Sequence, residues 1–391
     1  MKHVVHISND YFPIASGINT HLQNLPSEIK KQGFNITLLV TVESEDKIHK
    51  IETNEKDGVR IVKVYHADAF SNFDKLFHIT QSVKRGLVWI SENIDSIDIL
   101  HQHDERATRL GATIFAKKKD IPIIWTNHSA GFFKKKWNPI RFLSHFSTLV
   151  PDGIISVHQL VHKEFQHHTR YQKIPCCYIP NGVDLNQLDR KSTNTTQNKS
   201  TVLFPQRMIH IKGPEILAKA ALELFKSNPD INISYLFAGS DSASNIEDKT
   251  IGIVKEILKP LLNEGLVTFA GNPSYGNMAD LYRSADIVVL PLLVESENLS
   301  VFEAWASECA LIVSEQLAQN NYVKDGKNCL VVANNNYSQL KEAILKLVDD
   351  VDFKRKLIRR GKETVEKQFS WEMIAKETAK FYELIIDRYN E

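Results

Sequence analysis

Cysteine is scarce in this chain of 391 residues, which contains only four. Neither their number nor their spacing fits the disulfide framework of a small secreted protein or a cysteine-ligated zinc site. The sequence therefore predicts reduced thiols in the protein core at Cys176, Cys177, Cys309 and Cys329.

Long apolar runs are also missing, since no segment approaches the roughly 20 residues of a membrane-spanning helix. The chain opens with MKHVVHIS, which leads directly into a strand-like run and lacks the architecture of a signal peptide. These two absences predict a cytoplasmic protein.

The chain has no excess of one charge sign, because its formal net charge is +1 at pH 7. Residues 1–182 hold 23 basic and 18 acidic residues, a charge of +5, and the remainder carries −4. A nucleic-acid-binding protein would show a basic stripe interleaved with aromatic residues, so we expect no nucleic-acid partner. The contrast instead suggests two halves with different partners.

Apolar, β-branched runs bounded by polar turns alternate with helix-like segments in two successive series. This pattern is typical of parallel α/β sheets that are covered on both faces. Between the series lies LNQLDRKSTNTTQNKST, a polar stretch typical of a linker. We predict two parallel-sheet domains, residues 1–182 and 202–368, joined by a linker at 183–201.

Two acids, Glu295 and Glu303, lie on either side of an expected strand-to-helix loop. Its amides at Asn298, Leu299 and Ser300 should stand at the positive end of a helix dipole, where a phosphate can bind. Glu303, about one turn into the helix, can accept hydrogen bonds from a vicinal diol such as a ribose. The alternative is that Glu295 and Glu303 are solvated acids favoured by the dipole.

Two cations follow the first strand of the second series. Arg207 ends that strand and Lys212 precedes a Gly-Pro helix start, so both can reach one point beyond the sheet. Two fixed cations would stabilise a departing diphosphate. In the first series, Gly17 could let backbone approach a phosphate. Taken singly, surface cations and an ordinary turn glycine explain these residues equally well.

In their order, several segments resemble the landmarks of family 4 glycosyltransferases, which have the GT-B fold. They are IPNGVD, RMIHIKG, LYRSADIVVLP, the E-x7-E pair with its EAWA, VKDGKNCLVV and FSWEMIAKETAKFYE. The resemblance covers nearly the full length. It implies two Rossmann-like domains facing a central cleft, with a C-terminal helix, about 369–391, that crosses back to the first domain.

The resemblance implies a retaining, metal-independent hexosyl- or N-acetylhexosaminyltransferase that needs no cofactor. A nucleotide-diphosphate sugar would be the donor, with a UDP-sugar expected and a GDP-sugar as the alternative. The expected acceptor is a cell-surface glycan or a lipid-linked precursor. Two other functions stay open: a nucleotide-sugar 2-epimerase of the same architecture, and a non-catalytic nucleotide-sugar-binding partner subunit.

The resemblance also assigns roles to residues. It places Glu295 against the donor sugar, Glu303 against the ribose and the two cations against the diphosphate. It places Gly17 near the acceptor-side face of the phosphates and His128 beside the donor sugar and acceptor. The implied catalytic set is Glu295, His128, Arg207 and Lys212. The donor-binding set adds Gly17, Gly239, Asn272, Asn298, Leu299, Ser300 and Glu303.

The chain departs from the family pattern close to this site. Where relatives carry Gly-Phe-Gly-Leu, it has Ser296, Glu297, Asn298 and Leu299, and Glu308 replaces a glycine. The charge of Glu297 beside a diphosphate is unfavourable unless it points away. These departures motivate the non-catalytic alternative.

No metal centre is expected. His101 and His103 lie two apart on one expected strand, where a metal site is the alternative to the structural pair that we favour. The only D-x-D, formed by Asp350 and Asp352, lies in a charged helix connection and is expected at the surface.

The segment GFFKKKWNPIRFL, from Gly131 to Leu143, combines basic and aromatic residues. This composition suits the headgroup layer of an anionic membrane. It predicts peripheral association with the inner face of the membrane. A solvated loop with its aromatic side chains packed inward is the alternative.

Overall fold

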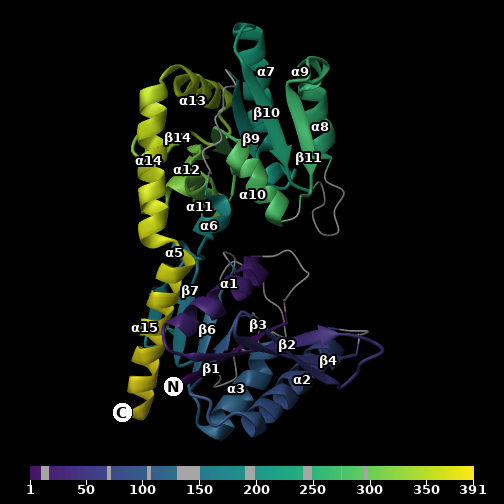
Figure 1. Ribbon diagram of the computed structural model, residues 1–391, viewed down its shortest axis with the longest axis vertical. Helices are drawn as coiled ribbons and strands as arrows, with labels where there is room; N and C mark the ends of the chain where they lie inside the picture. The colour runs from purple at the N-terminus through teal and green to yellow at the C-terminus, as the bar shows by residue number, and fades with distance from the viewer. Residues whose placement is uncertain are drawn as a thin grey trace. The chain divides into compact units, whose positions relative to one another are not determined.

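The computed structural model describes residues 1–9, 17–67, 72–103, 107–129, 150–189, 199–240, 249–273, 275–294 and 298–391. These residues form two compact units (Figure 1). Unit 1 comprises Met1–Gly182 and Trp371–Glu391, and unit 2 comprises Val183–Ser370. Among the described helices, none is long and apolar enough to span a membrane.

Unit 1 is built on a sheet of eight strands in the order β3-β4-β2-β1-β5-β6-β7-β8. All neighbours are parallel except β3 and β4, which form an antiparallel hairpin. The strands are β1 (His3–Ser8), β2 (Asn35–Glu43), β3 (Ile51–Lys56), β4 (Val59–His66), β5 (Ile99–Gln102), β6 (Ile123–Asn127), β7 (Gly153–Ser156) and β8 (Cys176–Tyr178).

Strand β3 is not one of the apolar runs from which the sequence predicts strands, because its residues, IETNEK, are mostly polar and exposed. Asp57 and Gly58, both with positive φ, form the turn between β3 and β4. An Asp-Gly pair is a strong signal for a two-residue hairpin turn. The Asp-Gly turn, rather than the composition of β3, is therefore the sequence signal for this hairpin.

Helices cover both faces of the unit 1 sheet. They are α1 (Gly17–Lys31), α2 (Asn72–Asn93), α3 (Ala107–Lys119), α5 (Gln159–His167) and α15 (Trp371–Asn390). Val4 packs with α1 and α15 on one face, and Val5 packs with α2, α3 and α5 on the other. A side chain at Gly153 would collide with Phe381 and Ile385 of α15, so this helix is part of the unit 1 core.

Unit 2 has a fully parallel six-stranded sheet in the order β11-β10-β9-β12-β13-β14. Its strands are β9 (Ser200–Phe204), β10 (Ile233–Ala238), β11 (Val267–Gly271), β12 (Ile287–Leu290), β13 (Ala310–Ser314) and β14 (Leu330–Val332). Its helices are α6 (Leu185–Leu188), η1 (His210–Lys212), α7 (Pro214–Ser227), α8 (Thr250–Ile257), α9 (Lys259–Asn263), α10 (Tyr275–Ser284), α11 (Leu299–Ala306), α12 (Glu315–Ala318), α13 (Tyr337–Asp349) and α14 (Val351–Gln368).

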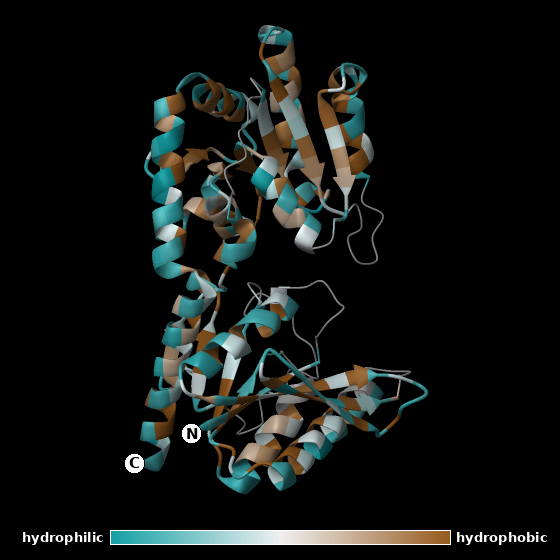
Figure 2. Cartoon of the chain, viewed as in Figure 1, coloured by the Kyte–Doolittle hydropathy of each residue, from teal (hydrophilic) through white to brown (hydrophobic). Residues whose placement is uncertain are grey.

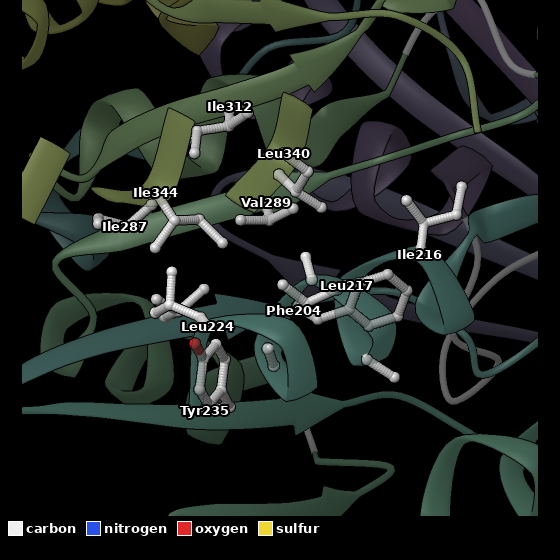
Figure 3. Close-up of a cluster of buried hydrophobic side chains, with 14 of the residues drawn as sticks. Phe204, Ile216, Leu217, Leu224, Tyr235, Ile287, Val289, Ile312, Leu340 and Ile344 are labelled. Carbon is white, nitrogen blue, oxygen red and sulfur yellow. The ribbon is translucent and has the colours of Figure 1, made fainter. Parts of the chain in front are cut away.

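Two apolar layers hold unit 2 together. In one layer, side chains of α7 and α13 such as Leu217 and Leu340 meet Phe204 and Val289 of the sheet (Figure 3). The other layer packs α10, α11 and α12 on the opposite face. Helix α14 buries only a narrow stripe and shows mostly hydrophilic residues on its visible side (Figure 2). Burial on both faces explains why the strands read as continuous apolar runs.

The expected linker is in part regular structure that belongs to unit 2. Val183 pairs with Ser370, and the Asp184 side chain caps α6 by accepting hydrogen bonds from two backbone amides. Leu188 of α6 is buried in the second apolar layer. Residues 190–198 lie outside the described part of the chain.

Candidate functional site

The two cations of the second series follow β9 in a loop that ends at the start of α7. Arg207 is exposed, whereas Lys212, the last residue of η1, is 5% exposed. Gly213 has a φ of 72°, and a Cβ there would lie 2.2 Å from the carbonyl oxygen of Pro291. The loop after β9 is therefore pressed against the segment after β12, and only glycine fits at the contact.

Gly239, at the end of β10, closes on the same loop. Its φ is 151°, and a Cβ there would lie 2.1 Å from the carbonyl oxygen of Gln206 and 2.9 Å from the amide nitrogen of Arg207. The amide of Met208 donates to the carbonyl of Ser240 at 2.8 Å. The structure thus brings Gly239 and Arg207 together.

A side-chain bridge joins the β9 loop to the start of α11. Gln206 Nε2 donates to Asn298 Oδ1 at 3.1 Å and to Ser300 Oγ at 2.7 Å. Asn298 Nδ2 donates back to Gln206 Oε1 at 3.1 Å. The sequence analysis missed Gln206, and no local pattern marks it, because its partners lie more than 90 positions away.

The start of α11 corrects one expectation. Asn298 is the N-cap residue, and its Oδ1 accepts the amide hydrogen of Ser300 at 2.9 Å. The amide of Ser300 is therefore used by the cap and does not stand open for a phosphate, as side-chain capping satisfies one of the first helical amides. Asn298, a departure from the family pattern, thus has a structural role.

Glu303 is held from one side by a tyrosine of α10. Tyr282 Oη donates to Glu303 Oε2 at 2.7 Å. Burial raises the pKa of Glu303, and its hydrogen bonds with Tyr282 and Ser300 lower it in part. Tyr282 and Ser300 therefore both orient the carboxylate of Glu303, and Tyr282 does so through Oε2.

Glu308 terminates α11 with a φ of 55°, in the left-handed region. The amide of Cys309 donates to Ala304 and that of Glu308 to Trp305, the two bonds of a Schellman motif. The Glu308 carboxylate pairs with Lys362 of α14, which also lies 3.3 Å from the Asp189 carboxylate. An ion-pair network thus accompanies a backbone conformation that favours glycine.

Among the other expected site residues, the structure describes Asn272 and Gly17. Asn272 is exposed just after β11, and Gly17 is the first residue of α1 with open space around it. Glu295 lies outside the described residues, as do 296–297 and 131–143. Asp350 of the D-x-D caps α14 by accepting the amide hydrogen of Phe353 at 2.9 Å.

In unit 1 the structure gathers a histidine cluster, which we define as His6, His21, His101, His103 and His128. Strands β1 and β5 are neighbours, with His6 opposite His101. Strand alternation places His6, His101 and His103 on the face covered by α1 and α15. His21 comes from α1.

Hydrogen bonds connect most of this cluster. His6 Nδ1 lies 2.8 Å from His103 Nε2, and His6 Nε2 lies 3.2 Å from the hydroxyl of Tyr382 on α15. His101 bonds the same hydroxyl through Nδ1 and Thr126 Oγ1 at 2.6 Å through Nε2. His101 and His103 do lie together, and Tyr382 is a partner that the sequence analysis missed.

All five imidazoles are driven toward the neutral form. Burial lowers the pKa of His6 to about 3 and that of His21 to about 4. It also lowers the pKa values of His101, His103 and His128. Neutral rings can both donate and accept, so the cluster can bind a polar ligand without carrying charge.

Two family models match the chain in succession. The model for Glycosyltransferase Family 4 matches residues 15–187, and the model for Glycosyl transferases group 1 matches residues 186–364. The first match lies in unit 1 apart from its last residues, and the second lies in unit 2.

Similar proteins match along nearly the whole chain. An uncharacterized glycosyltransferase of Methanocaldococcus jannaschii is 26% identical, over 96% of this chain and 97% of its own. The D-inositol 3-phosphate glycosyltransferase of Corynebacterium glutamicum is 22% identical, over 94% and 91% respectively. The structure of Anabaena HepE in complex with UDP and glucose has a TM-score of 0.71 at 12% identity, covering 98% of this chain and 100% of that one.

The structural likeness shows the fold, and the family models add the activity class. The structural likeness and the two successive family matches both agree with a chain that forms two sheet-based units. The chain therefore belongs to glycosyltransferase family 4, has the GT-B fold and is a glycosyltransferase.

Proposed function

We propose that unit 2 binds a nucleotide-diphosphate sugar at the ends of β9 and β12. From β9 the chain adds strands toward one edge of the sheet, through β10 to β11, and from β12 it adds them toward the other edge, so the strand order switches between β9 and β12. In open α/β sheets, ligands bind beyond the carboxyl ends of the strands at such a switch point. Gln206, after β9, and Asn298, after β12, are hydrogen-bonded across it. This fixed junction is the observation that carries the proposal.

The groups around the junction suit the parts of such a donor. Arg207 and Lys212 follow β9 and supply the positive charge that a diphosphate leaving group requires. Glu303, oriented by Tyr282, offers a carboxylate oxygen to the ribose hydroxyls. UDP is the proposed nucleotide, supported by the UDP bound to Anabaena HepE, with GDP as the alternative.

The proposed reaction moves a hexosyl or N-acetylhexosaminyl group with retention and without a required metal. Glu295 would contact the donor sugar. Gly17 and His128 of unit 1 would serve the acceptor side, where neutral imidazole can bind hydroxyl groups or handle a proton. The proposed acceptor is a cell-surface glycan or a lipid-linked precursor.

The test uses single-site variants of the cations. Arg207→Ala and Lys212→Met should each lower kcat/KM for nucleotide release by about 100-fold or more, because lost electrostatic stabilisation at a developing anion costs about 3 kcal/mol. Lys219→Ala, an exposed lysine on α7, is the matched control. Turnover close to wild type in both variants, with UDP affinity intact, would contradict the donor site.

Incubation with a panel of nucleotide sugars separates the two alternatives from transfer. Acceptor-dependent release of nucleotide supports transfer, inversion at C2 without release supports the 2-epimerase, and neither supports the binding subunit. Two of the departures from the family pattern have structural partners in α11: Asn298 caps its start and Glu308 forms an ion pair after its end.

We also propose that residues 131–143 attach the enzyme to the inner face of an anionic membrane. Replacing Lys134, Lys135 and Lys136 with Gln should reduce sedimentation with anionic vesicles, most strongly at low salt, where screening is weakest. Nucleotide release without acceptor should stay unchanged. A wild-type protein that ignores such vesicles at low salt would favour a soluble acceptor.

A further inference from the structure

Unit 1 contains two groups of three histidines, and in each group the ring nitrogens are close enough to bind one metal ion. The first consists of His6, His101 and His103. Both ring nitrogens of His6 and both of His101 are already hydrogen-bonded. A metal ion there would have to break these buried bonds. The second triad, His21, His103 and His128, is built differently.

His21 presents a nitrogen lone pair inside the protein. Its Nδ1 lies 2.8 Å from Asn181 Oδ1, which can only accept, so Nδ1 carries the proton and Nε2 the lone pair. His21 is 3% exposed, and its Nε2 is buried with no hydrogen-bond partner among the described residues. A buried acceptor without a donor is costly, and a cation would relieve it.

His103 and His128 face each other with the spacing of two metal ligands. His103 Nδ1 and His128 Nε2 are joined by a hydrogen bond of 3.3 Å, and a metal ion bound to both would displace its proton. Zn–N bonds of about 2.0–2.1 Å at a tetrahedral ion place the ligand nitrogens roughly 3.3–3.4 Å apart. Each histidine of the triad offers one ring nitrogen, and these nitrogens lie within 4.8 Å of one another, so small side-chain shifts would close the triad on an ion.

The bonds behind His103 are compatible with the required tautomer. If His103 Nε2 donates to His6 Nδ1, then His6 Nε2 donates to Tyr382 and the Tyr382 hydroxyl donates to His101. His101 Nε2 then donates to Thr126, and every bond in the chain has one donor and one acceptor. This direction leaves a lone pair on His103 Nδ1. Outer hydrogen bonds of this kind orient histidine ligands in metal sites.

We propose that His21 Nε2, His103 Nδ1 and His128 Nε2 form a Zn²⁺ site whose fourth position is open to water or an anionic oxygen. Three neutral imidazoles with an open position are a known ligand set for Zn²⁺. The ion is not required for sugar transfer. Its consequence rests on the role proposed above for His128: a ring that ligates Zn²⁺ cannot contact the sugar, so Zn²⁺ inhibits transfer.

The test titrates Zn²⁺, and then Co²⁺ as a coloured probe, into the metal-stripped full-length chain without any nucleotide sugar. We expect one ion per chain and the visible absorption of tetrahedral Co²⁺. His21→Gln and His128→Gln should each weaken Zn²⁺ binding by 100-fold or more. Asn181→Leu, which removes the partner of His21 Nδ1, should weaken it by about 10- to 100-fold. His167→Gln, an exposed histidine of the same unit, should bind as the wild type does.

Binding that persists unchanged in both His21→Gln and His128→Gln would overturn the site, and so would wild-type affinity no tighter than that of unfolded chain. Circular dichroism checks the fold of each variant. If His21→Gln does not fold, His128→Gln decides, because its side chain is only half-buried. Inhibition of nucleotide release by Zn²⁺, and its reversal by a chelator, is measured separately, so failure of the proposed reaction leaves the binding result intact.

Discussion

At the scale of single residues, Glu303 shows how its surroundings modify a carboxylate that the sequence already marks. Tyr282 orients it through a 2.7 Å hydrogen bond, and burial raises its pKa. An acid with a raised folded-state pKa keeps its proton at a pH where the unfolded chain has lost it. The stability that such a group contributes is present at pH values below its pKa in the unfolded chain. This contribution is lost as the pH rises through its pKa in the folded protein. Ionised Glu303 therefore destabilises the fold at neutral pH.

Glu303→Gln should accordingly raise the free energy of unfolding at neutral pH, because the amide can still accept from Tyr282 and carries no buried charge. The gain should shrink as pH falls toward 4.5, the ordinary value for this carboxyl group. Urea unfolding across that range measures it. UDP affinity should fall about tenfold, since a neutral acceptor binds ribose hydroxyls more weakly than a carboxylate does. A variant that is less stable at neutral pH, or that gains nothing on raising the pH, contradicts this account.

At the scale of elements, α11 is fastened at both ends by residues that depart from the family pattern. Asn298 caps its start and pairs with Gln206, and Glu308 closes its end with a left-handed backbone. A non-glycine residue in that conformation costs roughly 1 kcal/mol. The ion pair with Lys362 offsets part of this strain, although half-exposed pairs contribute at most about 1 kcal/mol.

Replacing Glu308 separates strain from ion pairing. Glu308→Ala keeps the strain and loses the pair, whereas Glu308→Gly loses both. We expect Glu308→Gly to unfold with a free energy within about 1 kcal/mol of wild type and to exceed Glu308→Ala by about 1 kcal/mol. Lys362→Met should resemble Glu308→Ala. Equal stability of the Gly and Ala variants would show that the backbone at this position carries no strain.

At the scale of the whole molecule, each unit has its own apolar layers, but only unit 2 is continuous in sequence. Unit 1 takes Trp371, Phe381 and Tyr382 from α15 into its core. Its Gly182 lies so close to Trp371 that a Cβ would approach the indole within 2.5 Å. The stability of unit 1 therefore depends on the last helix of the chain.

Deleting residues 371–391 should destabilise unit 1 strongly, because several large apolar side chains and the Tyr382 hydroxyl are removed from its interior. A fragment of residues 183–370 should fold cooperatively and retain UDP binding. Calorimetry of the deletion variant, with and without UDP, distinguishes the units: the transition that UDP shifts should survive and the other should be lost. Retention of both transitions would show that α15 is dispensable.

The sequence alone determined the two α/β domains, their mainly parallel sheets and the family, because apolar period, turn chemistry and motif order are local properties of the chain. The same local reasoning missed β3, whose polar residues carry no apolar signal. It placed the amide of Ser300 in the open, whereas the structure shows that amide donating to Asn298 Oδ1.

Only the tertiary structure decided which side chains meet. Gln206 reaches Asn298 because β9 and β12 are neighbours in the sheet although 82 residues or more separate them. The histidine cluster forms because β1 and β5 pair with His6 opposite His101, and because α15 returns Tyr382 to them from the far end of the sequence. Strand order and register are set by the burial of whole faces, a property of the entire unit, so no short stretch of sequence contains them.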